Sequence, residues 1–281
     1  MKELKILGVI IFFTLVTYWG VEPLAHSIFH PHVEPADFEF SDLPPVQGKG
    51  EVATGKELVV ANCTGCHSIK SQGYPAPLDN ASANASYGVV PPDLSTAGKI
   101  YNENFLANFI KNPAHATKTE HKFVGGKVHP MPSFNWMSDN DIASIIAYLK
   151  FIAPKEMTNR EVFVDACGRC HNMKYAKIKA TSDVSNYMGS TPPDLSMMIR
   201  SRGEHYLTTF INDPQKHLHG TAMPRVGLTQ EAEEQVIAFL EEIGDSKKEE
   251  REALAPYVLG FLVFMAIISL LWKKEVWSEV E

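Results

Sequence analysis

Cysteine and histidine residues recur in this chain in one short pattern that can bind an iron-containing group. All four cysteines of the 281 residues lie in two C-x-x-C-H segments, CTGCH at 63–67 and CGRCH at 167–171. In this pattern each thiol can form a thioether with a vinyl group of haem, and the histidine that follows can bind the iron. A zinc site or a thioredoxin-like redox pair also uses paired cysteines, but two complete copies with no cysteine left over disfavour both. The motifs predict two covalently bound haem c groups, attached through Cys63 and Cys66 with His67, and through Cys167 and Cys170 with His171.

A methionine follows each motif at a place where it can supply the second axial ligand. A haem iron held by one histidine needs another ligand to become six-coordinate, and a thioether raises the reduction potential relative to a second histidine. Met131 lies in HPMPSF, where flanking prolines restrict the backbone to an extended loop. Met223 lies in the related segment TAMPR of the second half. We therefore predict His67 with Met131, and His171 with Met223, as metal ligands.

Other side chains in each half compete for the position of second ligand. Met137 lies directly before a predicted helix cap, a place more typical of core packing than of ligation. The other methionines of the second half come too early in the sequence, and its histidines are typical of surface groups. The competing residues are Met137, His115, His121 and His129 in the first half, and Met188, Met197, Met198, His205, His217 and His219 in the second.

A P-P-D-L-S segment follows each C-x-x-C-H motif, at 91–95 and at 192–196. A histidine that binds a metal usually donates its other ring N–H to a backbone carbonyl. The carbonyls of Pro92 and Pro193 are candidate acceptors, and the same segments are also consistent with simple rigid turns. Because both halves hold a full set of axial ligands, we expect no open coordination position, which favours electron transfer over catalysis at iron.

The region between the two apolar ends of the chain is an internal duplication. The order C-x-x-C-H, P-P-D-L, an apolar helix ending in Asn/Asp-Pro, Met-Pro and a closing helix occurs twice. Each copy has about 100 residues, a reasonable size for one small domain. The predicted parts are an N-terminal anchor (1–29), a linker (30–50) that forms an extended tether, domain 1 (51–153), domain 2 (154–244), a charged connector (245–254), a C-terminal transmembrane helix (255–273) and a tail (274–281).

The closing helix of each copy can be located from its cap and its apolar face. Ser138 with Asp141 three residues later is a short-acid form of the capping box. Isoleucines and a leucine then recur at helical spacing from Ile142 to Leu149. In the second copy Thr229 is the predicted cap, followed by an apolar face from Val236 to Ile243. These stripes indicate core packing and an all-α fold.

Two apolar stretches, at 6–21 and at 257–272, bracket the duplication. Both are near the lower end of the roughly 17–25 residues that a spanning helix needs. A cleaved signal peptide is the alternative for the first stretch, but no Ala-x-Ala cleavage site follows it. Lysines lie on the outer flank of both stretches, which places both termini in the cytoplasm and the domains between them on the opposite side. These lysines are Lys2, Lys5, Lys273 and Lys274.

Composition is that of a globular protein, with 44% hydrophobic and 21% charged residues. The net charge of −7 gives no indication of a nucleic-acid partner. Haem is attached covalently outside the cytoplasm, so the haem domains are expected in the periplasm, held to a bacterial inner membrane and its lipid.

Each half resembles a class I cytochrome c domain in its C-x-x-C-H, its proline loop and its Met-Pro segment. The pair, over roughly residues 50–244, is similar to tandem dihaem cytochromes of the c4 type, and the C-terminal span with WKKEVW at 272–277 is similar to the membrane tail of cytochrome c1. Together they resemble the dihaem c4-like cytochrome c1 subunit of a bacterial ubiquinol–cytochrome c reductase, or cytochrome bc1 complex. Ordinary cytochrome c1 has one haem and a different soluble domain, so its contacts do not carry over.

This resemblance implies two tandem class I cytochrome c domains flanked by transmembrane helices. It also implies a non-catalytic subunit that passes electrons from a Rieske iron–sulfur protein to a soluble or membrane-bound cytochrome c, beside a cytochrome b subunit. A dihaem subunit of a cbb3-type oxidase and a free-standing anchored shuttle remain alternatives, although cbb3 subunits are typically anchored from the N-terminal side. A dihaem peroxidase would need a displaceable ligand at one iron, which the matching Met-Pro segments disfavour.

Overall fold

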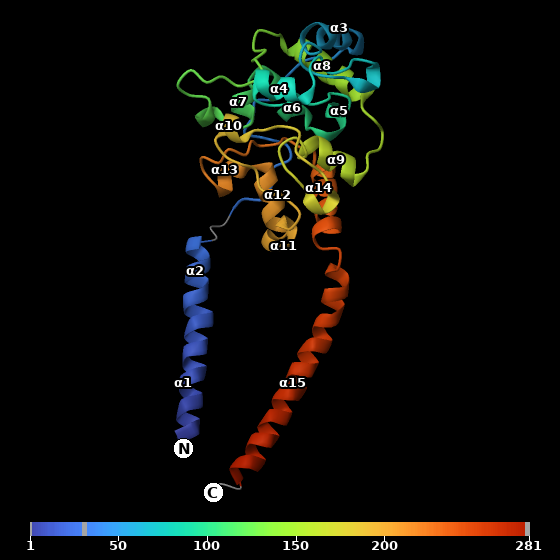
Figure 1. The fold of residues 1–281 in the computed structure, drawn as a ribbon. Helices are drawn as coiled ribbons and strands as arrows, with labels where there is room; N and C mark the ends of the chain where they lie inside the picture. Colours follow the sequence, from blue (N-terminus) through green and yellow to red (C-terminus); the bar gives the residue numbers. More distant parts are fainter. Residues whose placement is uncertain (1, 30–32, 279–281) are drawn as a thin grey trace.

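The two domains lie one above the other, over a pair of long terminal helices (Figure 1). The computed structural model describes residues 2–29 and 33–278. Within these residues the chain is helical, with isolated β-bridges and no β-strand. The first domain lies farther from the terminal helices, and the second lies between it and them (Figure 1). The predicted all-α class, with tandem domains and apolar terminal helices, is confirmed.

Three helices build the core of the first domain: α3 (Val52–Asn62), α6 (Glu103–Lys111) and α8 (Asp139–Ile152). The predicted cap of α8 is present, because Ser138 and Asp141 bond each other's backbone N–H groups. Helix α3 lies close against α8 at Gly55, where a Cβ atom would be 1.9 Å from the carbonyl oxygen of Ser144. A side chain larger than hydrogen at that position would separate the two helices that support the first motif.

The second domain repeats this arrangement with α9 (Asn159–Ala166), α12 (Glu204–Asn212) and α14 (Gln230–Gly244). Thr229 caps α14 as predicted, by accepting a hydrogen bond from the backbone of Ala232. The shorter α-helices are α4 (Asn80–Tyr87), α5 (Ala97–Ile100) and α7 (Pro113–Ala116) in the first domain, and α10 (Ser185–Met188), α11 (Met198–Arg202) and α13 (Pro214–His217) in the second.

The domains are joined by backbone hydrogen bonds between residues 100–102 and 227–229. The backbone N–H of Asn102 donates to the carbonyl of Gly227, and that of Thr229 donates to the carbonyl of Ile100, both at 2.9 Å. Gly227 has φ +77°, and a Cβ there would overlap the ring of Phe105. A glycine is therefore required where the second domain closes over the first.

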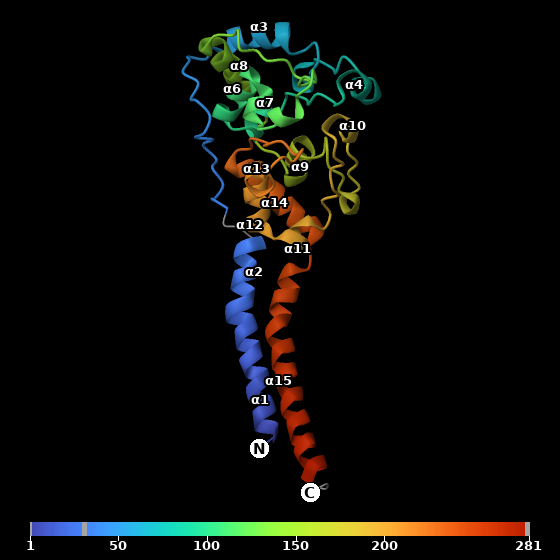
Figure 2. The same cartoon turned by 90° about the vertical axis from the view of Figure 1, so that its left-hand side faces the viewer.

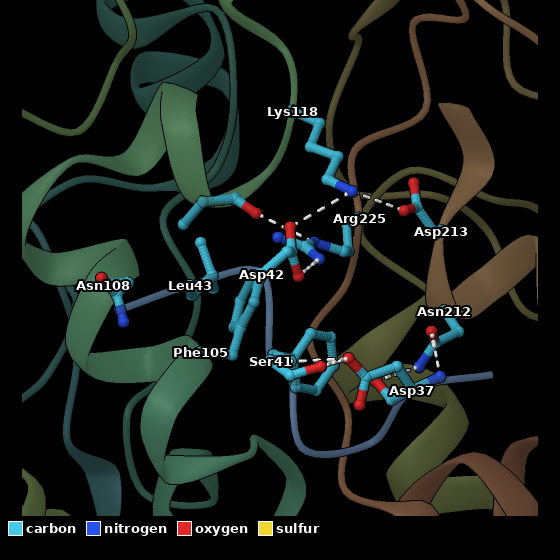
Figure 3. A network of polar contacts seen from close by, with 12 residues as sticks. Asp37, Ser41, Asp42, Leu43, Phe105, Asn108, Lys118, Asn212, Asp213 and Arg225 are labelled. Atoms are coloured by element: carbon cyan, nitrogen blue, oxygen red, sulfur yellow. Dashed lines mark hydrogen bonds and ion pairs between the residues drawn. The ribbon is translucent and has the colours of Figure 1, made fainter. Parts of the chain in front are cut away.

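Residues 33–50, here called the strap, run along both domains without helix or strand (Figure 2). The sequence predicts an extended tether over 30–50, of which residues 30–32 lie outside the described part of the chain. The strap turns at Phe40, which has φ +51° and accepts a hydrogen bond from the backbone N–H of Leu43 at 2.9 Å, and it is packed against the domains rather than free. Phe40 and Leu43 are 1% and 3% exposed and pack with Phe105 and Ala116. Leu43 and Phe105 are labelled in Figure 3. Phe40 and Leu43 therefore belong to the core, while most other residues of the strap are exposed.

The terminal helices descend from the same side of the domains, and both chain ends lie at the far end (Figures 1 and 2). The N-terminal one comprises α1 (Lys2–Val16), a π-helical turn (Thr17–Val21) and α2 (Glu22–Phe29); the C-terminal one is α15 (Lys248–Ser278). The segments Leu4–Phe29 and Lys248–Ser278 are long and apolar enough to cross a membrane, and the apolar stretch of each is not buried in the protein. These helices are suited to membrane anchoring.

Candidate haem-binding sites

The first C-x-x-C-H motif begins where α3 ends. The backbone N–H of Cys63 donates to Val59 at 2.9 Å, so this cysteine continues the helix by one residue. Cys66 and His67 then donate back to the carbonyl of Cys63 at 3.1 and 2.9 Å. This tight turn brings the two cysteines and the histidine of the motif together within one loop.

The second motif repeats this turn at the end of α9. The backbone N–H of Cys167 donates to Phe163 at 2.8 Å, and Cys170 and His171 donate to the carbonyl of Cys167 at 3.1 and 2.9 Å. None of the four cysteines forms a disulfide. Burial, with a smaller effect of the other cysteine of each motif, raises the pKa of Cys63 to about 11 and that of Cys167 to about 12, so both are neutral thiols.

Each motif histidine is held by the proline loop that follows it. Nδ1 of His67 lies 2.8 Å from the carbonyl oxygen of Pro92, and Nδ1 of His171 lies 2.8 Å from that of Pro193. Because a carbonyl only accepts, Nδ1 carries the proton and Nε2 is the nitrogen left for a metal. Burial lowers the pKa of both imidazoles, although these hydrogen bonds oppose it. A neutral, fixed imidazole is the form that binds iron.

The loops that hold the histidines are themselves fixed by short hydrogen bonds. Asp93 accepts from the backbone of Ser95 at 2.8 Å, and Asp194 accepts from that of Ser196 at 3.0 Å. In the first loop the hydroxyl of Ser68 also donates to Asp93 at 2.9 Å. The rigid turn and the histidine acceptor, weighed as two interpretations of this segment, are thus present together.

The two predicted methionines border the same hydrophobic cores as the motifs. Met131 packs on the cluster that Cys63 also borders, and Met223 packs on the cluster that contains Cys167. Met137 is 4% exposed within the first of these clusters, as expected for core packing. In the second domain Met198 packs against the core and Met197 is 41% exposed.

Several of the competing histidines are occupied by other contacts. Their partners lie in the same domain, except that His121 reaches a carbonyl of the second domain. The contacts are His115 to Glu120 (3.0 Å), His121 to the carbonyl of Thr221 (3.1 Å), His129 to the backbone N–H of Met131 (3.1 Å) and His217 to the hydroxyl of Thr209 (2.8 Å).

The donor set at each site fits haem c. Two thiols, one imidazole directed by a carbonyl and one thioether at the border of the core are the groups that haem attachment and axial ligation require. Across residues 2–29 and 33–278, no three His, Cys, Asp or Glu side chains come together as a metal-binding group. A structural zinc site needs four such ligands, so the donor set does not fit zinc.

Residues that the motifs alone do not reveal connect the two sites. Arg169 lies between the cysteines of the second motif, and its charge acts on Tyr101 and His67 in the first domain. Beside it, the hydroxyl of Thr96 donates to Asp165 at 2.7 Å. The only sign of this contact in the sequence is the charged residue inside one C-x-x-C-H motif, because the first-domain residues that Arg169 affects are distant from it in the sequence.

Known proteins are similar to all or part of the chain. A cytochrome c from Tetrahymena pyriformis is 28% identical over 109 residues, which cover 37% of this chain and 91% of that protein. A solved chain described as hyperthermophilic respiratory Complex III has 18% identity, covering 100% of this chain and 98% of that one. Its TM-score of 0.31 is too low to establish a shared arrangement. The family model for cytochrome c matches residues 52–152 and 159–244, more than half of the chain. This chain therefore belongs to the cytochrome c family, with two domains of that family in tandem.

Proposed function

We propose that the chain is a membrane-anchored dihaem electron carrier. Cytochrome c domains carry electrons on covalent haem, which exchanges one electron between its ferric and ferrous states. The observation that supports a haem in each domain is the repeated site, in which His67 and His171 each lie 2.8 Å from a proline carbonyl. In this proposal Cys63, Cys66, Cys167 and Cys170 form the thioethers, and domain 1 (51–153) and domain 2 (154–244) each hold one haem.

The axial ligands in this proposal are His67 with Met131 and His171 with Met223. Pro92 and Pro193 keep each imidazole in one tautomer and one orientation through their carbonyl oxygens. The half-buried methionines lie on the borders of the cores that support the motifs. A full ligand set in both domains suits electron transfer and disfavours a peroxidase.

In this proposal the two terminal helices cross a membrane, and both domains lie at one of its faces. Lysines at the outer flanks of both helices favour cytoplasmic termini, with the haem domains in the periplasm of a bacterium. The surfaces through which the domains accept and donate electrons would then face soluble or membrane-held redox proteins in the periplasm.

The tandem domains with a C-terminal span favour a subunit of a quinol:cytochrome c oxidoreductase. In that complex a Rieske iron–sulfur protein would supply electrons to the chain, and a cytochrome c would accept electrons from it. Cytochrome b would contact the apolar helices. This proposal is supported by the resemblance of the motifs and of the C-terminal tail, not by a contact in the structure.

Purification of the full chain from membranes tests the proposal. Co-purification with a b-type cytochrome and an iron–sulfur protein, together with quinol-driven reduction of cytochrome c, is the expected result. A chain truncated after Ser246 is the matched control, because it keeps α14 and loses α15. It should retain haem but lose the partners. Co-purification with oxidase subunits instead would assign the chain to a cbb3-type oxidase, and purification alone would indicate a free-standing shuttle.

A further inference from the structure

Tyr187 of the second domain contacts the loop that leads to Met131 in the first domain. It lies on α10, next to the first domain (Figure 2). Its hydroxyl donates to the carbonyl of Val128 at 2.8 Å, and the centre of its ring lies 5.8 Å from that of Phe123. Nζ of Lys127 donates to the backbone carbonyl of Tyr187 and lies 4.7 Å from the centre of its ring. One residue of the second domain therefore contacts this loop along its length.

The loop has little packing of its own between residues 124 and 128. All of these residues are exposed. Gly125 and Gly126 have φ +66° and +90°, and nothing lies within 4 Å of where their Cβ atoms would be. An exposed turn with few buried contacts opens easily unless neighbouring groups hold it. Contacts with the second domain can therefore fix the position of this turn.

His129 connects the loop with the methionine. Its Nδ1 lies 3.1 Å from both the backbone nitrogen and the carbonyl oxygen of Met131, so it can bond that backbone in either tautomer. Its ring centre lies 5.0 Å from that of Phe123, the same ring that Tyr187 contacts. On its other side the ring of Phe109 lies 6.2 Å away. A shift of the loop would therefore move the backbone that presents the thioether.

The duplicated half lacks both partners of this contact. Residues 114–130 separate the Asn-Pro pair from the methionine in the first domain, whereas only residues 215–222 separate the matching Asp-Pro pair from the methionine in the second. Aligned on the P-P-D-L-S segments, the counterpart of Tyr187 in the first domain is Ser86, which is exposed. Gly88 of the first domain leaves room for the tyrosine ring, because a Cβ there would lie 2.7 Å from its Cδ2 atom. The longer loop and the tyrosine that binds it thus form one asymmetric contact between the domains.

We propose that Tyr187 is a positioning residue for the axial methionine of the first domain, because it holds loop 123–130 in the place where Met131 can bind the iron. Burial raises the pKa of Tyr187 to about 12, so its hydroxyl keeps the proton that it donates to Val128. This inference rests on the proposed ligation of the first haem by His67 and Met131. The second domain then stabilises the ligand set of the first haem, and with it the reduction potential that a thioether confers.

Competition by imidazole tests this role in the full-length, haem-loaded chain. Imidazole that displaces a methionine from ferric haem removes the near-infrared sulfur-to-iron band, and a Met223→His background leaves this band to the first haem alone. In that background Tyr187→Phe loses the hydroxyl and keeps the ring. It should lower the imidazole concentration at half loss of the band by about two- to tenfold, the equivalent of one net hydrogen bond. Tyr175→Phe is the matched control, because this tyrosine of the second domain is 63% exposed, and it should leave that concentration unchanged.

A second background separates positioning of the methionine from a general loosening of the fold. In Met131→His protein the band belongs to the second haem, and Tyr187→Phe should leave its competition by imidazole unchanged. Equal shifts in both backgrounds, or no shift in the Met223→His background, would overturn the inference. Equal effects of Tyr187→Phe and Tyr175→Phe would also overturn it. A wild-type band with less than the intensity of two haems would instead contradict the proposed ligation by both methionines.

Discussion

Arg225 of the second domain binds Asp42 of the strap, with 2.7 Å between Nη1 and Oδ1 (Figure 3). The same arginine donates from Nε to the carbonyl of Ala116 in the first domain at 3.1 Å, and only 3% of its surface is exposed. Lys118 of the first domain contacts Asp42 at 3.2 Å and Asp213 at 2.6 Å. One strap carboxylate therefore joins cations from both domains, and it does so on the segment that leads from the N-terminal helix.

Replacing Asp42 by alanine should loosen the two domains. Arg225 would keep a buried charge without its carboxylate, but Asp42 is itself 43% exposed in its side chain, which reduces the effect. We expect a loss of about 1–2 kcal/mol in the free energy of unfolding, measured by denaturant titration of the haem-loaded chain. Glu103→Ala, which removes a more exposed pair with Lys150, is the control and should cost less than about 0.5 kcal/mol. Equal losses in the two variants would contradict the bridging role.

Each of the two motifs should attach one haem independently of the other, which gives two haems per chain. Replacing Cys63 and Cys66 by serine should halve the pyridine haemochrome yield per chain. The turn after α9 and its proline acceptor do not depend on these cysteines. The Cys167→Ser/Cys170→Ser variant is the reciprocal control. Loss of both haems from either double variant would show that the sites do not assemble separately.

Ligation of the haem iron by Met131 can be measured by spectroscopy, without an assay of electron-transfer activity. The oxidised wild-type chain should show the near-infrared sulfur-to-iron band with the intensity of two haems. Met131→His should remove about half of that band and lower one reduction potential, because histidine stabilises ferric iron relative to a thioether. Met137→Leu is the control, since Met137 is buried in the core of the first domain. A band that survives Met131→His and disappears in Met137→Leu would reverse the assignment.

The motif residues could be predicted from the sequence because their chemistry is local. A C-x-x-C-H turn and a capping box such as Ser138 with Asp141 depend on neighbours within a few residues. The packed strap could not be predicted, because Phe40 and Asp42 gain their partners from residues far along the chain, such as Phe105 and Arg225. Proline-rich composition indicated a segment without helix or strand, but it gave no information about which side chains of the domains would pack against that segment.

The junction at Arg169 was missed for the same reason. Its partners in the first domain, Tyr101 and His67, come together with it only when the domains pack. The duplication even obscures this contact, because the equivalent residues Gly65 and Arg202 are exposed. The internal duplication predicted the two sites, but it did not predict the contact between the domains, which differs in the two copies.

Glu233 should make stability depend on pH. Its side chain is 1% exposed, and burial, with a smaller effect of Glu234, raises its pKa from 4.5 to about 8. The folded state therefore keeps a proton that the unfolded state releases, so stability falls as the pH rises from about 4.5 to about 8. Glu233→Gln should remove this dependence and increase stability at pH 8 by a few kcal/mol.

Denaturant titrations of wild type and Glu233→Gln at several pH values from about 5 to about 8 would measure the free energy of unfolding as a function of pH. Glu242→Gln, an exposed change on the same helix, is the control and should follow the wild-type curve. A Glu233→Gln curve parallel to wild type would mean that the carboxyl is not protonated in the folded chain.

The topology of the membrane helices can be tested with introduced cysteines. If haem attachment consumes all four native thiols, a cysteine placed at Glu3 or Glu279 is the one reactive thiol in the chain. Both positions should react with a membrane-permeant maleimide in intact cells and resist an impermeant one, because lysines at the outer flanks favour cytoplasmic ends. Lys179→Cys is the matched control, since this exposed loop residue of the second domain should react with both reagents. Labelling at position 3 from outside, or its absence from the mature chain, would contradict an uncleaved N-terminal anchor, while the same result at position 279 would place the C-terminal end in the periplasm.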